Sequence, residues 1–394
     1  MRRSRGVPGA AADSPDMSGR GSRVYLDHNA TSWLRPEARE AILACLDEPG
    51  NPSSVHADGR RARARLEKAR ERLAAVLGVA PAQLVFTSGG SEADNLGLHQ
   101  TDRPVLVSAI EHPAVLAARA DAIPIPVEES GIVDLDALEA LLVRHRPGMV
   151  AVMLANNETG VIQPVAEVAR RVHAHGALLH VDAVQALGKL DFRLDELGAD
   201  FLAVSAHKLG GPVGIGALVV REGLALRPLV RGGGQERGRR AGTENVAAAV
   251  GFAAALAAWS EEEKRRLARL RDRMEEAMRD QVPEARIIGL GAPRLPNTSC
   301  VALPGVDAVT QLVRLDLAGI SVSAGSACSS GRIGRSHVLA AMGLPPAVCN
   351  SAIRISLGWS TTAAEIERFV EAWTGIARAL LPARGLALVP ARPT

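Results

Sequence analysis

Short apolar runs alternate with helix-like runs through residues 84–220, and this alternation limits the possible folds more than any other feature of the chain. The apolar runs occupy residues 84–87, 105–109, 149–155, 178–181, 201–204 and 217–220. Between them lie helix-like stretches such as 134–145 and 164–175, the second of which begins with proline and is followed by Gly176. Continuous apolar strands separated by helices predict an α/β fold with a mostly parallel sheet that helices cover on both faces.

The remainder of the chain predicts a second domain. A length of 394 residues is enough for two domains. Beyond residue 243 the pattern changes to a long helix through residue 280, followed by strands and helices at 299–303, 307–317, 353–357 and 363–381. We therefore expect a large domain over residues 23–245, whose first dozen residues pack on the other domain, and a smaller α+β domain over residues 246–394. Residues 1–22 are rich in Gly, Ser, Pro and Arg, which predicts a disordered extension.

The composition argues against membrane and nucleic-acid partners. Hydrophobic residues make up 47% and charged residues 23% of the chain, as in ordinary soluble proteins, and the net charge is +3. Because the basic residues are scattered among acids along helices, we expect no direct nucleic-acid binding. The apolar runs are shorter than the ~18 residues that span a bilayer, so we expect no membrane partner.

The cysteines and histidines predict no metal site. The four cysteines lack C-x-x-C spacing, which argues against zinc and disulfides and favours reduced thiols in the cytoplasm. Cys45, Cys300 and Cys349 lie in or beside apolar runs and are expected to be buried and inert. His173 and His175 do not share a helix face, so a solvated helix end is preferred to a metal pair.

Lysine is scarce, which makes elimination possible. Lysine and arginine together number 46, yet lysine occurs only at positions 68, 189, 208 and 264. Lys68 and Lys264 lie in charged helix-like runs, and Lys189 follows a glycine beside the polar run D-F-R-L-D-E. Only Lys208 has an apolar strand before it and the flexible run L-G-G-P-V-G after it. Burial there would lower the pKa of the Lys208 amine and make it a candidate nucleophile toward carbonyl groups; a surface lysine that ends a strand is the alternative.

Polar residues follow the predicted strands at the points where these strands end, which is where open parallel sheets bind ligands. The run S-G-G-S at 88–91 opens a helix and offers N–H groups and hydroxyls to a phosphate, and Asp182 can hold a proton on a ring nitrogen. Taken alone, the S-G-G-S run is also explained by a serine that caps the helix, and Asp182 by a carboxylate that caps a turn. Together with Lys208 they match what pyridoxal phosphate requires: a phosphate anchor, a partner for the ring nitrogen and a lysine that forms a Schiff base. Further polar residues at this rim are Glu111, His112, Asn156, Asn157, Glu158, Gln185, Ser205 and His207.

A series of motifs, in order from Tyr25 to the last helix, resembles the cysteine desulfurases of the IscS/NifS branch. The motifs are Y-L-D-H-N-A-T-S, N-P-S-S-V-H-A-D-G-R, F-T-S-G-G-S-E-A-D-N, E-H-P-A-V, N-N-E-T-G, H-V-D-A-V-Q, S-A-H-K-L-G-G-P-V-G-I-G, G-G-G-Q-E-R-G-R-R-A-G-T-E-N, S-A-G-S-A-C-S-S-G and R-I-S-L-G-W. The resemblance implies an enzyme of the class V aminotransferase family with the type I fold of pyridoxal-phosphate-dependent transferases, and a cytoplasmic homodimer. The implied reaction converts L-cysteine to L-alanine and leaves a persulfide on the enzyme.

The resemblance also implies roles for individual residues. Lys208 carries the cofactor, Asp182 pairs with the ring nitrogen, and His112 stacks on the ring and shuttles protons. Arg354 binds the substrate carboxylate, with Asn29 beside it. The cofactor phosphate is held by Gly90, Ser91, Ser205, His207 and Thr243 of the partner subunit. Gln185 and Asn157 contact the ring hydroxyl. Asn157 also lies near the substrate carboxylate. The sequence departs from the commonest family pattern at G-G-S-E, where Ala-Thr is frequent, at His28 and at Trp359.

Cys328 is the candidate sulfur-accepting residue. It lies in a run of Ser, Gly and Ala without a hydrophobic period, which predicts an exposed loop where a thiolate forms at modest cost. In the implied mechanism this thiolate attacks the substrate sulfur. A selenocysteine lyase or another β-lyase, which needs no loop cysteine, and a non-catalytic sulfur-relay scaffold are the alternative functions. A sulfur-acceptor protein is the expected partner; iron–sulfur cluster assembly, tRNA thiolation and DNA phosphorothioation all draw on enzymes of this type.

Overall fold

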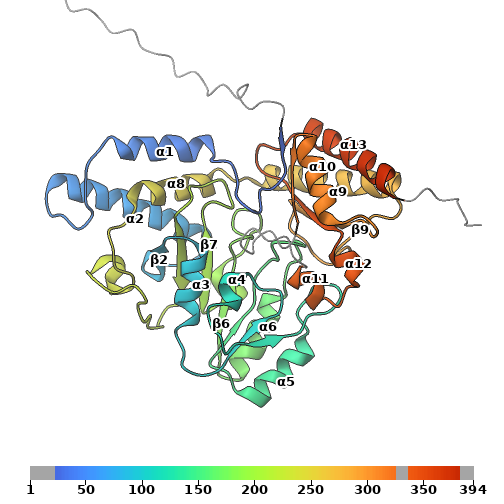
Figure 1. Ribbon diagram of the computed structural model, residues 1–394. Coiled ribbons are helices and arrows are strands. Elements are labelled where there is room, and N and C mark those ends of the chain that lie inside the picture. The colour runs from blue at the N-terminus through green and yellow to red at the C-terminus, as the bar shows by residue number, and fades with distance from the viewer. Residues whose placement is uncertain (1–22, 325–335, 382–394) are drawn as a thin grey trace, which may run out of the picture.

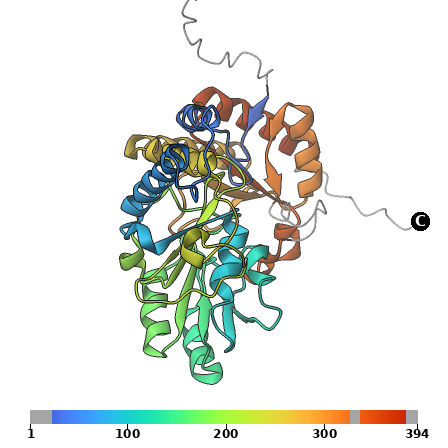
Figure 2. The same cartoon turned by 90° about the vertical axis from the view of Figure 1, so that its left-hand side faces the viewer.

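The structure is a computed structural model that describes residues 23–324 and 336–381 (Figure 1). The expected disordered extension over residues 1–22 lies outside the described residues. A seven-stranded and a four-stranded sheet form the framework of the described chain, and a two-stranded sheet pairs residues 24–25 with residues 320–321. The orange and red elements around the smaller sheet lie at one end of the larger one, as Figures 1 and 2 show.

The larger sheet has the strand order β2-β8-β7-β6-β5-β3-β4. Strand β8 runs antiparallel to both of its neighbours, and the other pairs are parallel, so the predicted α/β fold with a mostly parallel sheet is confirmed. The strands are β2 (Leu84–Thr87), β3 (Val105–Ser108), β4 (Ile123–Ile125), β5 (Met149–Ala151), β6 (Leu178–Asp182), β7 (Phe201–Ser205) and β8 (Gly216–Val220).

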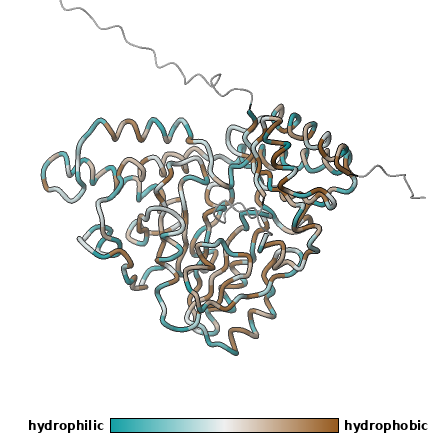
Figure 3. Tube along the Cα trace, viewed as in Figure 1, coloured by the Kyte–Doolittle hydropathy of each residue, from teal (hydrophilic) through white to brown (hydrophobic). Residues whose placement is uncertain are grey.

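Side chains of this sheet alternate between two apolar cores. In β2, Leu84 and Phe86 join one core and Val85 joins the other, as the two-residue period of a strand requires. Hydrophobic colour runs along these central strands in Figure 3. The helices that complete the first core are α2 (Ala57–Leu77), α5 (Leu135–His145), α6 (Val165–Ala174), α7 (Leu194–Leu197) and α8 (Val246–Ala257). Helix α8 also packs with α1 (Pro36–Leu46). The second core is completed by α3 (Gly90–Leu98) and α4 (Pro113–Leu116).

The smaller sheet has the order β12-β13-β10-β9, with antiparallel pairs. Its apolar core also contains Val24 and Leu26 from the start of the described chain. The elements of this region are α9 (Glu261–Gln281), β9 (Arg286–Ile287), β10 (Thr298–Ala302), α10 (Ala308–Leu317), β11 (Ile320–Ser321), β12 (Ser323–Ala324), α11 (His337–Ala341), α12 (Pro346–Cys349), β13 (Ala352–Ser356) and α13 (Ala363–Leu380). The domain boundary at residue 245 stays a prediction.

Two expected elements differ from the structure, and one strand was not predicted. The long helix expected through residue 280 is two helices: α8 ends at Ala257, and Ser260 starts α9 as its N-cap by accepting a 3.2 Å hydrogen bond from the N–H of Glu263. Strand β4 was not predicted, since Pro124 interrupts its three residues and removes one N–H. The strand expected over residues 149–155 ends at Ala151.

The segment over residues 24–35 connects the two cores. Strand β1 (Val24–Tyr25) pairs in parallel with β11, and the N–H of Ser356 donates to the carbonyl of Leu26 at 2.8 Å. Farther along, the N–H groups of Ser32 and Arg35 donate to the carbonyls of His207 and Gly210, at 2.9 and 2.8 Å. The chain between these two anchors therefore lies beside Lys208. Across residues 23–324 and 336–381, none of the helices is long and apolar enough to cross a membrane.

Candidate active site

A cavity of about 210 Å³ lies where strands β6 and β7 end and helix α3 begins. It brings together most of the predicted site residues, and with them Asp94, Met153, Ala155 and Val184, which were not predicted. The predicted residues in its lining are Asn29, Gly90, Ser91, His112, Asn157, Asp182, Gln185, Ser205, His207 and Lys208. Segments distant in sequence thus meet at the carboxyl edge of the sheet.

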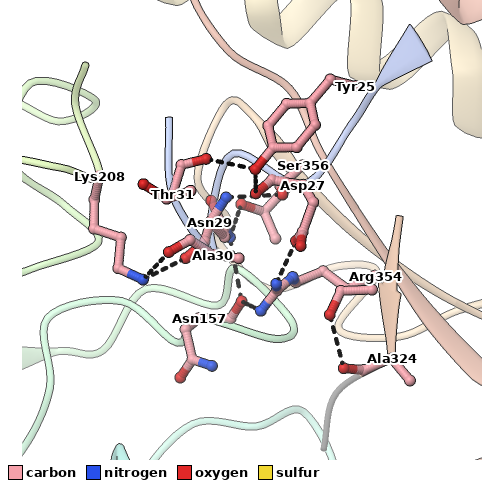
Figure 4. A network of polar contacts seen from close by, with 12 residues as sticks. Tyr25, Asp27, Asn29, Ala30, Thr31, Asn157, Lys208, Ala324, Arg354 and Ser356 are labelled. Atoms are coloured by element: carbon pink, nitrogen blue, oxygen red, sulfur yellow. Dashed lines mark hydrogen bonds and ion pairs between the residues drawn. The ribbon is translucent and has the colours of Figure 1, made fainter. Parts of the chain in front are cut away.

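Lys208 lies just beyond the end of β7, as the pattern of its neighbours predicts. Its Nζ donates to the carbonyl oxygens of Asn29 and Ala30, each at 2.7 Å (Figure 4). The side chain is half-buried and reaches the cavity. Two backbone carbonyls therefore hold the amine at the cavity wall.

Asp182 supplies a buried carboxylate to the same cavity. Because Leu179 and Val181 point into the first core, Asp182 points to the opposite face of β6, toward α3. One oxygen accepts a 2.8 Å hydrogen bond from the N–H of Val184. Burial, and then the neighbouring carboxylate of Asp94, raises the pKa of Asp182 to about 8. A cationic group in the cavity would favour the ionised form of this carboxylate.

A second buried acid, Asp94, lies one helical turn into α3 and was missed by the sequence analysis. It is hydrogen-bonded to His180 at 3.1 Å, and both side chains are almost fully buried. Burial raises the pKa of Asp94 to about 8, and burial lowers that of His180 to about 4. The spacing of Asp94 from Gly90, one turn along the predicted helix, was the available signal.

The opposite part of the cavity suits an anion. Gly90 and Ser91 begin α3, and among the described residues no side chain caps this N-terminus. The buried Oγ of Ser205 has no hydrogen-bond partner within the described part of the chain. A Cβ at Gly90 would lie 2.7 Å from Val184, so glycine keeps this wall open. His207 completes the group, with Nδ1 3.3 Å from the hydroxyl of Thr31.

His112 has a defined tautomer. Its Nδ1 accepts a 3.1 Å hydrogen bond from the backbone N–H of Ala114 at the start of α4, so the neutral ring carries its proton on Nε2. Burial, followed by the positive charge of Lys208, lowers the pKa of His112 to about 4. The ring is therefore neutral at pH 7, and it can accept a proton only when Nδ1 leaves Ala114.

Arg354 lies beside the cavity and is held by two acceptors (Figure 4). Its Nη2 donates to Asp27 at 2.6 Å and its Nη1 to the carbonyl of Asn157 at 3.1 Å. Its buried Nε has no partner among the residues that the structure describes. Asn29 connects this group to the cavity, because its Nδ2 donates to the Asn157 carbonyl at 3.2 Å. Asp27 was not predicted.

Lys189 is buried, although the sequence places it beside the polar run D-F-R-L-D-E. It is 2% exposed, and its Nζ donates to Oε1 of Gln185 at 3.0 Å. The turn after β6 and the bridge between Leu187 and Leu190 fold this segment inward. The spacing of four residues between Gln185 and Lys189 was the missed signal.

The remaining predicted residues lie elsewhere. Thr243 is exposed and does not line this cavity. Cys328 lies outside the described residues. Cys300 and Cys349 are buried as expected, but Cys45 is partly exposed on α1. His173 and His175 are hydrogen-bonded to Asp200 and Glu139, and no group of three or more potential ligands forms a metal site within the described ranges.

Comparisons with known proteins agree with this geometry. Residues 24–369 match the family model described as aminotransferase class-V. The cysteine desulfurase of Cereibacter sphaeroides is 45% identical over 367 residues, which cover 89% of this chain and 94% of the relative. The cysteine desulfurase of Trichormus azollae is 42% identical over 381 residues, 92% of this chain and 95% of the relative. A NifS-like protein from Rickettsia africae superposes with a TM-score of 0.85 at 36% identity, over 90% of this chain and 99% of that one.

The chain therefore belongs to the aminotransferase class-V family, and its fold is that of the NifS-like structures. Within this family the relatives named above are cysteine desulfurases, so the family predicted from the motifs is confirmed.

Proposed function

We propose that the protein is a pyridoxal-phosphate-dependent cysteine desulfurase. The observation that carries the proposal is the meeting of a lysine amine, a buried carboxylate and an uncapped helix N-terminus in one cavity, at Lys208, Asp182 and Gly90. Two features fit the cofactor: the unpartnered Oγ of Ser205 suits a phosphate oxygen, and the pKa of Asp182, raised by burial and by Asp94, marks a carboxylate whose ionised form a protonated ring nitrogen would stabilise.

Residues around the cavity would hold the cofactor by its separate groups. Lys208 would attach to its aldehyde carbon, and Asp182 would hold the proton on its ring nitrogen. Gly90, Ser91, Ser205, His207 and Thr243 of the partner subunit would hold the phosphate, and Gln185 and Asn157 the ring hydroxyl. When bound, pyridoxal phosphate supplies an aldehyde that condenses with amines and a ring that accepts the electron pair left on the substrate α-carbon.

The residues of the chain then act on the substrate directly. Arg354 binds the carboxylate of L-cysteine with its free Nε–H and with donors now held by neighbouring acceptors. The Lys208 amine, once released, takes the α-proton. His112 presents a flat neutral ring with an Nε2–H donor.

Sulfur transfer completes the reaction. The Cys328 thiolate attacks the substrate sulfur, the carbon–sulfur bond breaks with its electron pair on carbon, and that carbon takes up a proton. L-Cysteine and the enzyme thiol thus become L-alanine and the enzyme persulfide, with no other oxidant or reductant. Support for Cys328 comes from its motif, S-A-G-S-A-C-S-S-G.

Product analysis tests the proposal. Purified protein is given L-cysteine with and without a thiol reductant, and alanine, sulfide and protein persulfide are quantified. We expect one persulfide-forming cysteine, alanine in equal amount to transferred sulfur, and no persulfide in Cys328→Ala, whereas Cys45→Ala keeps wild-type turnover. Continued turnover in Cys328→Ala would instead identify a β-lyase such as a selenocysteine lyase. Absence of cofactor at Lys208 would identify a non-catalytic scaffold.

The assembly, the partner and the location belong to the same proposal. The exposed Thr243 and the exposed Leu229 and Val230 support a homodimer in which each subunit contributes to the other's phosphate site. A sulfur-acceptor protein of an iron–sulfur cluster or thio-cofactor pathway would take the persulfide, in the reducing cytoplasm. Light scattering measures the dimer. Mixing Lys208→Ala subunits with Thr243→Ala subunits should restore one wild-type site per mixed dimer, and no recovery would contradict the shared site.

A further inference from the structure

Lys189 is a second lysine of the active-site region, and it has no role in the chemistry described above. It is 2% exposed, at the end of the turn that follows β6. Gly188 makes this turn possible, because its φ of 81° is left-handed and a Cβ there would lie 2.9 Å from the Trp259 ring. The lysine side chain is thus directed into the protein instead of into solvent.

The ammonium group of Lys189 meets two amide oxygens. Its Nζ donates to Oε1 of Gln185 at 3.0 Å and to Oδ1 of Asn29 at 3.3 Å. A protonated lysine can only donate, so both amides turn their oxygens toward the ammonium group. The Nδ2 of Asn297, 3.1 Å from the same Oδ1, selects the same orientation for Asn29.

These orientations fix where the two NH₂ groups point. The Nε2 of Gln185 donates to the backbone carbonyl of Asn29 at 3.0 Å. That carbonyl also accepts from Nζ of Lys208 at 2.7 Å. The Nδ2 of Asn29 donates to the carbonyl of Asn157 at 3.2 Å, and that carbonyl also accepts from Arg354 at 3.1 Å. Through Gln185 and Asn29, Lys189 therefore reaches acceptors of both Lys208 and Arg354.

The charge of Lys189 is not balanced by an acid. Within the described residues it forms no ion pair, and its hydrogen-bond acceptors are neutral. The charged groups that act on it are Lys208, in the loop after β7, and Arg354, on β13, both of which are cations. Burial, and then these two charges, lowers the pKa of Lys189 to about 7. Packing alone would be provided as well by an apolar side chain of this length, whereas the two hydrogen bonds need a donor.

We propose that Lys189 is a positioning residue of the active site, which orients the amides of Gln185 and Asn29 and through them holds the amine of Lys208 and the guanidinium of Arg354. The proposal rests on the proposed function for its catalytic consequence, but the contacts themselves can be tested in the protein without cofactor.

The first experiment is a lysine titration. The chain contains only four lysines, so biosynthetic labelling with [ε-¹³C]lysine gives few resonances, which Lys189→Gln and Lys68→Met assign. In cofactor-free protein we expect the Lys189 resonance to titrate near pH 7, because burial lowers the pKa of this amine to about 7. A midpoint near the ordinary ~10.4 of lysine would show a solvated amine, not one buried against Gln185 and Asn29, and would overturn the proposal. This measurement needs no activity, so its outcome is separate from that of the proposed function.

The second experiment compares Lys189→Met, which removes the donor, with Lys189→Gln, which keeps an NH₂ donor of similar reach. We expect Lys189→Met to lose roughly tenfold in kcat and to bind pyridoxal phosphate more weakly, whereas Lys189→Gln stays within about threefold of wild type. Lys68→Met, on the exposed face of α2, is the matched control. Equal losses in the two Lys189 variants, or wild-type behaviour of Lys189→Met, would overturn the proposal. Thermal melting reports whether each variant folds, and the titration decides the matter if Lys189→Met does not.

Discussion

Arg354 and Asp27 lie 327 positions apart in the chain and are joined by a 2.6 Å hydrogen bond between Nη2 and Oδ1. The arginine belongs to the smaller sheet and is 1% exposed, whereas the aspartate precedes the turn that leads to Asn29. The pair therefore joins the substrate-binding side of the proposed site to the chain segment that contacts Lys208.

Asp27→Asn should lower the stability of the protein. Removing the carboxylate leaves a buried guanidinium without its charged partner, which costs about 3 kcal/mol in comparable pairs. The Asp27 side chain is 20% exposed, so solvent will reduce this loss. Denaturant unfolding of cofactor-free protein measures the change, and Asp316→Asn, on the exposed pair with Arg23, is the control that should change little. Equal stability of Asp27→Asn and wild type would show that the pair contributes nothing.

Arg354→Lys should weaken substrate binding more than turnover. Lysine keeps the positive charge but loses the planar fork that holds a carboxylate with two bonds, so we expect KM for L-cysteine to rise at least roughly tenfold. Steady-state kinetics measure the effect, with Arg314→Lys on the exposed side of α10 as control. An unchanged KM would remove Arg354 from the substrate site.

Asp182→Asn should abolish most activity yet stabilise the cofactor-free protein in alkaline solution. The pKa of Asp182 is raised from 3.8 to about 8, so the folded state binds the extra proton between these values. The associated stabilisation is complete below pH ~4 and is lost as the pH rises through about 8. Denaturant unfolding at pH 5 and pH 9 should therefore show wild type losing more stability than Asp182→Asn. Activity should fall about 100-fold. Parallel stability curves would contradict the raised pKa.

His112 should stay neutral far below the usual histidine pKa. Because burial and Lys208 lower its pKa to about 4, the folded state binds fewer protons than the unfolded chain between pH 4 and pH 6.5, and stability rises with pH across that interval. Histidine NMR of cofactor-free protein, assigned with His112→Phe, should show no titration of this ring near pH 6.5. His145, on α5, is the comparison ring. A His112 midpoint near 6.5 would contradict the burial argument.

Gly188→Ala tests the turn that directs Lys189 inward. The added methyl would meet Trp259 at 2.9 Å in a left-handed backbone conformation, so we expect a loss of stability on the order of 1–3 kcal/mol and lower cofactor affinity. Gly223→Ala has a similar φ of 83° but open space around it, and isolates the backbone part of the loss. Equal losses in both variants would show that Trp259 yields without cost.

The sheet and the residues at the ends of its strands could be predicted from sequence, because apolar runs and strand ends are local signals. Asp182 and Lys208 follow such runs directly, and the cavity contains both. The break between α8 and α9 was visible only as Ser260, since the composition on both sides favours helix. Strand β4 had too short an apolar run around Pro124 to be recognised.

The residues that were missed depend on how distant segments meet. Lys189 was judged by the polar residues after it, but its environment is made by Asn29, which is 160 positions away. Asp27 gains its importance from Arg354, and Asp94 from His180. Neighbours in sequence carry no information about such partners, so a single chain without its fold could not assign them.

The short stretch that runs from β1 to Arg35 is hydrogen-bonded at one end to Ser321 and Ser356 of the small-sheet region. At its other end it is hydrogen-bonded to the loop that contains Lys208. This segment therefore links the small-sheet region to the large-sheet region through hydrogen bonds at both of its ends. A movement of the small-sheet region relative to the larger sheet would shift the carbonyls of Asn29 and Ala30, which hold the Lys208 amine. Such a movement would therefore change the position of the reactive amine.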